Sequence, residues 1–236
     1  MNDLERTTLL ARLARQIAGT GADQALEWRL CRAYLAIMGG DGAAITLSYT
    51  DPSRVTLCTT DDVASRLEDL QDVLGEGPGP TAYQTEAITT ADLRQRRGPW
   101  PLFTEAARDI PGPAILYAVP MRPGPSVIGV LTVHQDAAAG LPDYEQAQFL
   151  ADAIGAALLK ESPSSESQLQ SGPWSTRAGI HQATGMVVVQ LRVGPDDAIA
   201  LMRAHAFSHN ITLAEVAHRI TSRRLRFSDG AESETS

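Results

Sequence analysis

The stretch TRAGIHQATGMVVVQLRVGPDDA, residues 176–198, decides how the C-terminal part of the chain folds. Its apolar residues recur at helical spacing and predict a helix over 176–191. Two glycines lie inside that helix, although each costs a helix roughly 1 kcal/mol relative to alanine. Arg177, His181 and Gly185 are spaced by four residues, so they share one face of the helix. This face is either a point of close helix packing or a small, basic surface that meets a partner.

Two further helices are expected after this one. Residues 194–210 place a proline in the first turn and two aspartates near the positive helix start, and Asn210 is a plausible left-handed stop. Residues 212–227 begin with a Thr-x-x-Glu capping box and continue into an arginine-rich end. The sequence therefore predicts a small all-α domain of three helices over residues 174–228.

The charge is distributed unevenly along the chain. The whole chain has 236 residues and a net charge of −8. Residues 174–228 carry seven arginines against three carboxylates, whereas residues 1–173 carry 13 basic and 22 acidic residues. A basic module on an acidic body favours a polyanionic partner for the module. The alternative is a solvated helix end whose arginines contact only water.

The first 160 residues show a mixed pattern of helices and strands. Alternating apolar residues and turn signals predict strands at 43–49, 54–60, 87–93, 114–121 and 126–135. Helical spacing predicts helices at 3–18, 22–38, 61–74, 101–110 and 142–160, with a Gly/Pro turn at 75–83. The two last strands flank an RPGP turn and form a hairpin candidate. This order predicts an α+β domain, with an antiparallel sheet and flanking helices on one face.

The domain boundaries follow from composition. The sheet domain is expected over 1–161, and the Ser- and Pro-rich segment 162–173 is expected to be a linker. Residues 229–236 are acidic and polar and are expected to be a disordered tail. No apolar run reaches the roughly 18 residues of a membrane span, and the N-terminus lacks the apolar core of a signal peptide. We therefore expect a cytoplasmic protein without a membrane partner.

The C-terminal residues resemble a known family. The run RAGIHQATGMVVVQLRVGPDDAIALMRAHAFSHNITLAEVAHRI is similar to the ANTAR domain, a three-helix RNA-binding module of bacterial transcription antiterminators. The upstream motifs LQDVLGEGPGPTAY, YAVPM and VIGVLTVH resemble the GAF domain, a common sensory module. A GAF domain followed by an ANTAR domain is a known arrangement in bacterial regulators. Unlike many relatives, this chain has a segment between the two domains that is a poor coiled-coil former.

The resemblance implies that the C-terminal domain binds paired stem-loops in nascent RNA and thereby prevents transcription termination. Splayed bases of hairpin loops are read by hydrogen bonds and stacking, and arginines meet the phosphates. On this basis the expected RNA-binding residues are Arg177, His181, Gln182, Gly185, Arg203, Asn210, Arg219, Arg223 and Arg224.

Each of these residues also has a purely structural explanation. Gly185 would be a helix–helix contact, and Arg203 would pair with Asp196 or Asp197 within its own domain. Asn210 would be only a helix stop, and the last arginines would offset the dipole of their own helix. The histidines of the module lack accompanying cysteines, so surface positions are favoured over a metal site.

The first domain gives fewer functional signals. GAF domains bind varied small molecules or none, so a small-molecule ligand is left open and no cofactor is assigned. His134 is expected to be a surface residue at a strand end rather than a haem ligand. Cys31 and Cys58 are expected to be buried free thiols, with a redox pair as the alternative. No catalytic constellation stands out, and we expect the protein not to be an enzyme.

Two further alternatives concern partners. The segment TLAEVAHRITSRRLR is also similar to a recognition helix, so a DNA-binding regulator with a GAF sensor domain is the second hypothesis. A homodimer is expected through a helical seam that involves Leu9, Leu13 and Ile17 together with Phe149, Ala153 and Leu158. The alternative is that these helices only cover the sheet of their own chain.

Overall fold

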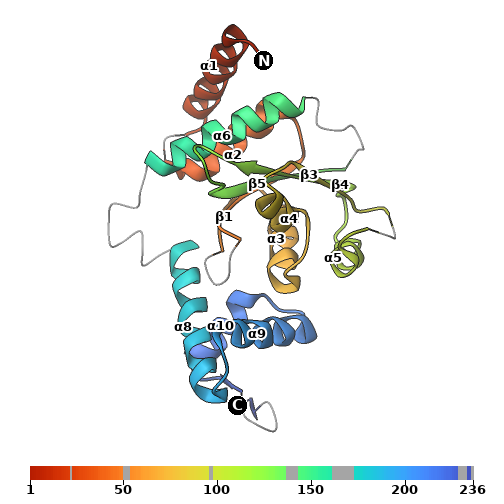
Figure 1. The fold of residues 1–236 in the computed structure, drawn as a ribbon, viewed down its shortest axis with the longest axis vertical. Coiled ribbons are helices and arrows are strands. Elements are labelled where there is room, and N and C mark those ends of the chain that lie inside the picture. Colours follow the sequence, from red (N-terminus) through yellow and green to blue (C-terminus); the bar gives the residue numbers. More distant parts are fainter. Residues whose placement is uncertain are drawn as a thin grey trace.

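The computed structural model describes residues 1–21, 23–49, 54–95, 98–136, 143–160, 173–227 and 233–234. A sheet with helices on both sides occupies one part of the molecule, and a small helical domain lies against it (Figure 1). The predicted linker, 162–173, falls outside the described residues except for its last position.

Five antiparallel strands form the central sheet. They are β1 (Gly42–Leu47), β2 (Val55–Thr59), β3 (Thr89–Asp92), β4 (Ile115–Met121) and β5 (Gly129–Gln135). Their order is β2-β1-β5-β4-β3. The predicted hairpin is confirmed, because β4 and β5 pair from Ile115 with Gln135 to Met121 with Gly129. The predicted α+β fold with an antiparallel sheet is therefore confirmed.

Two helices, α2 (Leu26–Met38) and α6 (Tyr144–Lys160), cover one face of this sheet, and α1 (Asp3–Gly19) packs against these two helices on the side away from the sheet (Figure 1). Side chains alternate along a strand, so residues such as Ile45 and Leu131 point into this layer. Leu9 and Leu13 of α1 are buried in the same core. These two leucines cover the core of their own chain, so the predicted dimer seam is wrong at both positions.

The opposite face carries α3 (Asp62–Leu74) and α4 (Pro78–Thr85), while α5 (Pro101–Ala107) packs against α3. The prediction that helices lie on one face only is therefore wrong. The predicted turn at 75–83 is also wrong, because α4 begins inside it. Its two prolines stand in the first turn of the helix, where the missing N–H group has no helical partner to lose.

The C-terminal domain contains α8 (Pro173–Leu191), α9 (Pro195–His209) and α10 (Leu213–Thr221). Its core is formed by buried apolar residues of all three helices: Ile180, Ala183, Val187, Ala198, Ile199, Met202, Ala206, Leu213, Val216, Ala217 and Ile220. Thr212 caps α10 by accepting the N–H of Glu215 at 3.1 Å, which is one half of the predicted capping box, while the Glu215 carboxylate pairs with Arg219. The three-helix domain is confirmed.

The third helix is shorter than predicted. It ends at Thr221 rather than at 227, because Ser222 donates back to the carbonyl of His218 and Arg223 takes a left-handed φ of 63°. The chain then turns so that Leu225 and Phe227 are buried against the helical core. Leu225–Arg226 form β6, which pairs with β7 (Ser233–Glu234). Residues 233–234 are the described part of the predicted tail.

The two domains are in contact. Helix α3 of the sheet domain packs against α9, and α8 contacts β2. The partly buried side chain of Val73 in α3 packs against the hydrophobic core of the helical domain. Among the described residues, no helix combines the length and the apolar character that a membrane crossing requires.

Candidate nucleic-acid interface

One long face of α8 is open to solvent. His181, Gln182 and Gly185 are exposed on it, and Arg177 is half-buried one turn earlier. A Cβ atom added at Gly185 would have no heavy atom within 4 Å, so this glycine is not a helix–helix contact. Val189 continues the row four residues further on and is 78% exposed. The face therefore has room for a partner to come close to the helix backbone.

The donors on this face influence one another. The guanidinium of Arg177 lies over the ring of Trp174, 5.9 Å from its centroid. Partial desolvation, and then the charge of Arg177, lower the pKa of His181. At neutral pH His181 is therefore a neutral imidazole that offers one donor and one acceptor, while Arg177 supplies the fixed charge.

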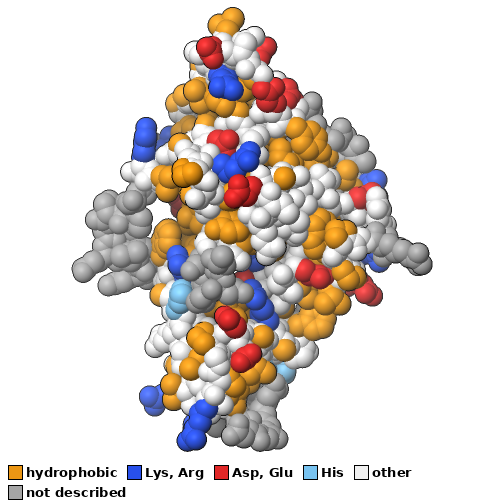
Figure 2. All heavy atoms as spheres, in the orientation of Figure 1, with side chains coloured by type: hydrophobic (Ala, Val, Ile, Leu, Met, Phe, Trp, Pro, Cys, Tyr) orange, Lys and Arg blue, Asp and Glu red, His pale blue; other side chains and the backbone are white. Residues whose placement is uncertain are grey.

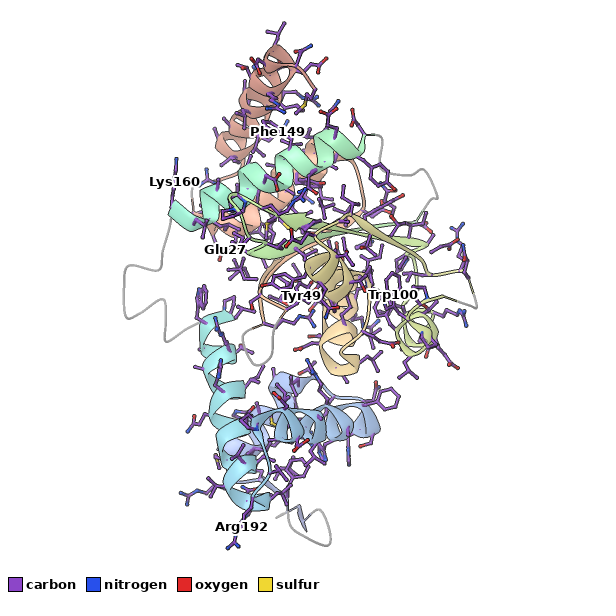
Figure 3. The ribbon with its side chains drawn as sticks, in the orientation of Figure 1. Glu27, Tyr49, Trp100, Phe149, Lys160 and Arg192 are labelled. Carbon is purple, nitrogen blue, oxygen red and sulfur yellow. The ribbon has the colours of Figure 1, made fainter. Side chains whose placement is uncertain are left out.

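The turn after α10 presents the arginines. Arg219 forms an ion pair with Glu215 of the same helix, with Nε and Oε1 2.9 Å apart. Arg223 and Arg224 follow the end of the helix and are exposed. Figure 2 shows Lys and Arg side chains at the end of this domain that lies farthest from the sheet, and Arg192 is labelled there in Figure 3.

A shallow hollow connects the arginine turn with α8. Met186 and Gln190 of α8 line it together with Arg223 and Arg226. The side chain of Gln190 also accepts the backbone N–H of Phe227 at 3.0 Å and so fixes the turn against α8. The structure thus brings the predicted arginine Arg223 next to the helix that carries the exposed glycine face.

Arg203 has a different environment. Its Nε donates to the backbone carbonyl of Asp72 at 2.7 Å, and its Nη2 lies 3.6 Å from the carboxylate of the same residue. Asp72 belongs to α3 of the sheet domain. The sequence favoured Asp196 or Asp197 of the same domain as the partner, and this prediction is wrong, because α9 turns this face toward α3.

Asn210 ends α9 in a left-handed conformation, with φ 51° and ψ 45°, as a helix stop does. It also lines a cavity between the helical domain and helices α3 and α5. Arg203 and Asn210 therefore face the sheet domain, whereas the other predicted RNA-binding residues lie on α8, on α10 or in the turn after it.

Two histidines of the helical domain, His205 and His209, contact each other. The rings of His205 and His209 stack with centroids 4.0 Å apart. His205 is buried, although a surface position was predicted, because it packs edge-on against Phe227. In the described part of the chain, no three His, Cys, Asp or Glu residues come together in a way that would hold a metal ion.

A buried polar network fills the space between the sheet and α3, beside Tyr49 (Figure 3). The carboxylate of Glu68 accepts hydrogen bonds from Thr46 at 2.9 Å, Thr132 at 2.7 Å and Arg54 at 2.7 Å. Arg54 also approaches Asp72, with Nη1 and Oδ1 3.4 Å apart. Nothing in the sequence pattern pointed to Glu68, because a charged residue beside Leu67 in a helical pattern predicts a solvated position.

Two other predictions about this domain can be compared with the structure. His134 is buried and lies 3.1 Å from the carboxylate of Asp61, so the predicted surface position is wrong. Cys31 is buried and Cys58 half-buried, and both are free thiols, as expected. The thiol of Cys58, and then burial, raise the pKa of Cys31, while Cys58 itself donates to the carbonyl of Glu27 at 3.3 Å.

The fold and the surface together define a two-domain protein in which an α+β domain is joined to a helical domain with an exposed cationic face. Residues 174–220 match the family model of the ANTAR domain. These residues therefore correspond to an ANTAR domain, which the α+β domain precedes in the chain. ANTAR domains belong to RNA-binding regulators of transcription antitermination.

Several solved structures are similar to the chain. The GAF domain of A. aeolicus nlh2 is 13% identical, with 67% of this chain and 98% of that chain covered and a TM-score of 0.47. A domain of a putative two-component sensor histidine kinase from Sinorhizobium meliloti 1021 is 14% identical, with 64% and 100% covered and a TM-score of 0.44. The GAF-B domain of DevS from Mycobacterium smegmatis is 16% identical, with 57% and 90% covered and a TM-score of 0.38. A comparison with curated proteins gives no match.

Proposed function

We propose that this protein binds stem-loop RNA through its ANTAR domain and regulates transcription by antitermination. The observation that supports this function is the coincidence of the ANTAR match at 174–220 with the open face of α8. Nascent RNA is a cytoplasmic partner in bacteria, so we also propose that the protein acts in the cytoplasm.

The chemistry of the face suits an RNA hairpin. Hairpin loops expose bases whose edges hydrogen-bond to polar side chains, and Gln182 and the neutral His181 supply donors and acceptors. The missing side chain at Gly185 lets a phosphate or a base approach the helix. Arg177, Arg223 and Arg224 supply charge for the backbone, and Arg219 does so partly, because Glu215 neutralises it.

Arg203 and Asn210 take a different role in this proposal. Both lie at the junction with the sheet domain, where Arg203 is bonded to Asp72. They would reach RNA only after the domains separate. In the docked arrangement we therefore assign RNA binding to the α8 face and the arginine turn.

The GAF-like domain is proposed to be the sensory part, and the assembly is proposed to be a homodimer. Helix α1 projects from the body of the molecule (Figure 1), and it exposes Leu4 at 77% and Leu10 at 44%. These two leucines replace Leu9 and Leu13 as the residues proposed for a dimer contact. A monomeric mass of the wild-type protein in light scattering at micromolar concentration would exclude it.

The test of the function is a binding comparison at matched salt concentration. A paired stem-loop RNA and a DNA duplex of equal length are titrated with the full chain. The proposal expects the RNA to bind at least about tenfold more tightly, a difference of 1.4 kcal/mol. Equal, strongly salt-dependent binding of both would show nonspecific charge attraction, and preference for DNA would support the alternative of a DNA-binding regulator.

A further inference from the structure

A cavity of about 530 Å³ lies between the two domains. Its walls come from α3 and α5 of the sheet domain and from the segment that joins α9 to α10 in the ANTAR domain. Small-molecule sites have volumes of about 300–1,000 Å³ and occur often at domain interfaces. The cavity therefore has the size and position of a ligand site that both domains share.

Part of the cavity wall is formed by apolar side chains that are exposed to solvent. Leu102 of α5 is 53% exposed and Phe207 of α9 is 58% exposed, and both line the cavity. They come from different domains, yet they face one space, together with the half-buried Leu70 and Ile211. An apolar group in the cavity would cover both exposed side chains at once, and burial of apolar surface is favourable by roughly 25 cal/mol per Å².

The polar part of the wall is acidic. Asp69, Glu105 and Asp109 line the cavity with a single basic residue, Arg66. Within the described part of the chain, none of the four has a hydrogen bond or an ion pair through its side chain. Partial desolvation, and then the charge of Asp72, raise the pKa of Asp69 to about 6, against the opposing charge of Arg54, although Asp69 is exposed. The wall thus carries three carboxylates and one cation. Figure 2 shows acidic and hydrophobic side chains next to each other over this junction.

We propose that this cavity binds an organic cation, an amine with a compact apolar body, which contacts both domains. The ammonium group would lie among Asp69, Glu105 and Asp109, and the apolar body would pack against Leu102 and Phe207. Charge-assisted hydrogen bonds to carboxylates are about twice as strong as neutral ones, so an amine is selected over a neutral molecule of equal shape.

This inference goes beyond the proposed function, because binding at the junction requires no RNA. A ligand that touches both walls also stabilises the contact between the domains, since it binds the docked arrangement better than the separated one. The amine would therefore hold Arg203 and Asn210 against the sheet domain.

The experiment uses isothermal titration of the full chain with three probes of similar size. They are phenethylamine, its neutral analogue 2-phenylethanol and the anion 3-phenylpropanoate. We expect the amine to bind with a dissociation constant at least about tenfold lower than that of the other two. The double variant Glu105→Gln/Asp109→Asn should weaken the amine about tenfold or more, and Phe207→Ala should weaken it several-fold, about 3- to 10-fold.

Glu86→Gln is the matched control, because Glu86 is an exposed carboxylate outside the cavity. It should bind the amine as the wild type does, and circular dichroism should show that every variant is folded. Three results would overturn the proposal: no binding of the amine up to about 10 mM, equal binding of the amine and the alcohol, or unchanged affinity in the Glu105→Gln/Asp109→Asn variant.

Discussion

Asp72 of α3 holds Arg203 of α9 by two contacts, one through its backbone carbonyl at 2.7 Å and one through its carboxylate at 3.6 Å. The same carboxylate lies 3.4 Å from Arg54, which is bonded to the buried Glu68. A chain of charges thus runs from the centre of the sheet domain to the ANTAR domain. Helix α3 thus links the buried network of the sheet domain to the ANTAR domain through Asp72.

The first prediction concerns the docking of the domains. Arg203→Ala removes both contacts to Asp72, whereas Asp72→Asn keeps the backbone contact and loses only the charge. We expect Arg203→Ala to weaken docking by about 1 kcal/mol and Asp72→Asn by less, because the pair is partly exposed to solvent. Small-angle scattering should give a larger radius of gyration for Arg203→Ala than for Asp72→Asn. Identical scattering from wild type and Arg203→Ala would show that this contact does not hold the domains.

The second prediction concerns Glu68. Glu68→Ala removes the carboxylate 2.7 Å from the buried guanidinium of Arg54 and leaves it only the more distant Asp72 at 3.4 Å, so the change should cost up to about 3–5 kcal/mol of the free energy of unfolding. The double variant Arg54→Met/Glu68→Leu replaces both charges by apolar side chains and should cost clearly less. Urea unfolding measures the free energy of unfolding of both variants. If the double variant is as unstable as Glu68→Ala, the unpaired charge is not the cause.

The third prediction concerns pH. The pKa of Asp69 is raised to about 6 in the folded protein from its ordinary value of 3.8. The folded state thus prefers the protonated form, so the contribution of Asp69 to stability is present below pH 3.8 and lost as the pH rises through 6. Asp69→Asn mimics the neutral form. Its melting temperature should equal that of the wild type near pH 4 and exceed it above pH 6.

A pH-independent difference between the two melting curves would refute this assignment for Asp69. Asp62→Asn is the control, since Asp62 is an exposed residue of the same helix outside the cavity. It should show no gain in melting temperature that begins near pH 6.

The fourth prediction concerns salt dependence. Arg224 is exposed, and in the proposal it meets a phosphate, so Arg224→Gln should lower the slope of log K against log salt by roughly 0.7 to 0.9. Arg219→Gln should change it less, because Arg219 is already paired with Glu215 at 2.9 Å. RNA titrations at several salt concentrations give both slopes. A larger change of this slope for Arg219→Gln than for Arg224→Gln would contradict the prediction.

Sequence periodicity could predict the sheet and the three-helix domain, because apolar alternation and helical spacing are local properties. It could not predict the end of α10 at Thr221, since the turn depends on the burial of Leu225 and Phe227 by other helices. It placed helices on one face of the sheet only, because nothing in a single helix tells which layer it joins.

The candidate site was predictable to a similar extent. The row of Arg177, His181 and Gly185 follows from spacing alone, and in the structure His181 and Gly185 are exposed while Arg177 is half-buried. The contact of Arg203 with Asp72 joins residues 131 positions apart, which no local pattern signals. For the same reason Glu68 went unnoticed: it is buried against the sheet, and its partners Thr46 and Thr132 lie on strands far from it in the sequence.

The most direct test of the account is the affinity of Gly185→Leu for a paired stem-loop RNA. Nothing lies within 4 Å of an added Cβ at this position, so the variant should keep the melting temperature of the wild type or exceed it. Gly185→Ala controls for helix propensity, and Ala200→Leu, on an exposed site of α9, controls for added bulk. We predict that Gly185→Leu binds the RNA at least about tenfold more weakly while Ala200→Leu binds as the wild type does. Unchanged RNA affinity of a folded Gly185→Leu protein would contradict the assignment of the α8 face as the RNA-binding surface.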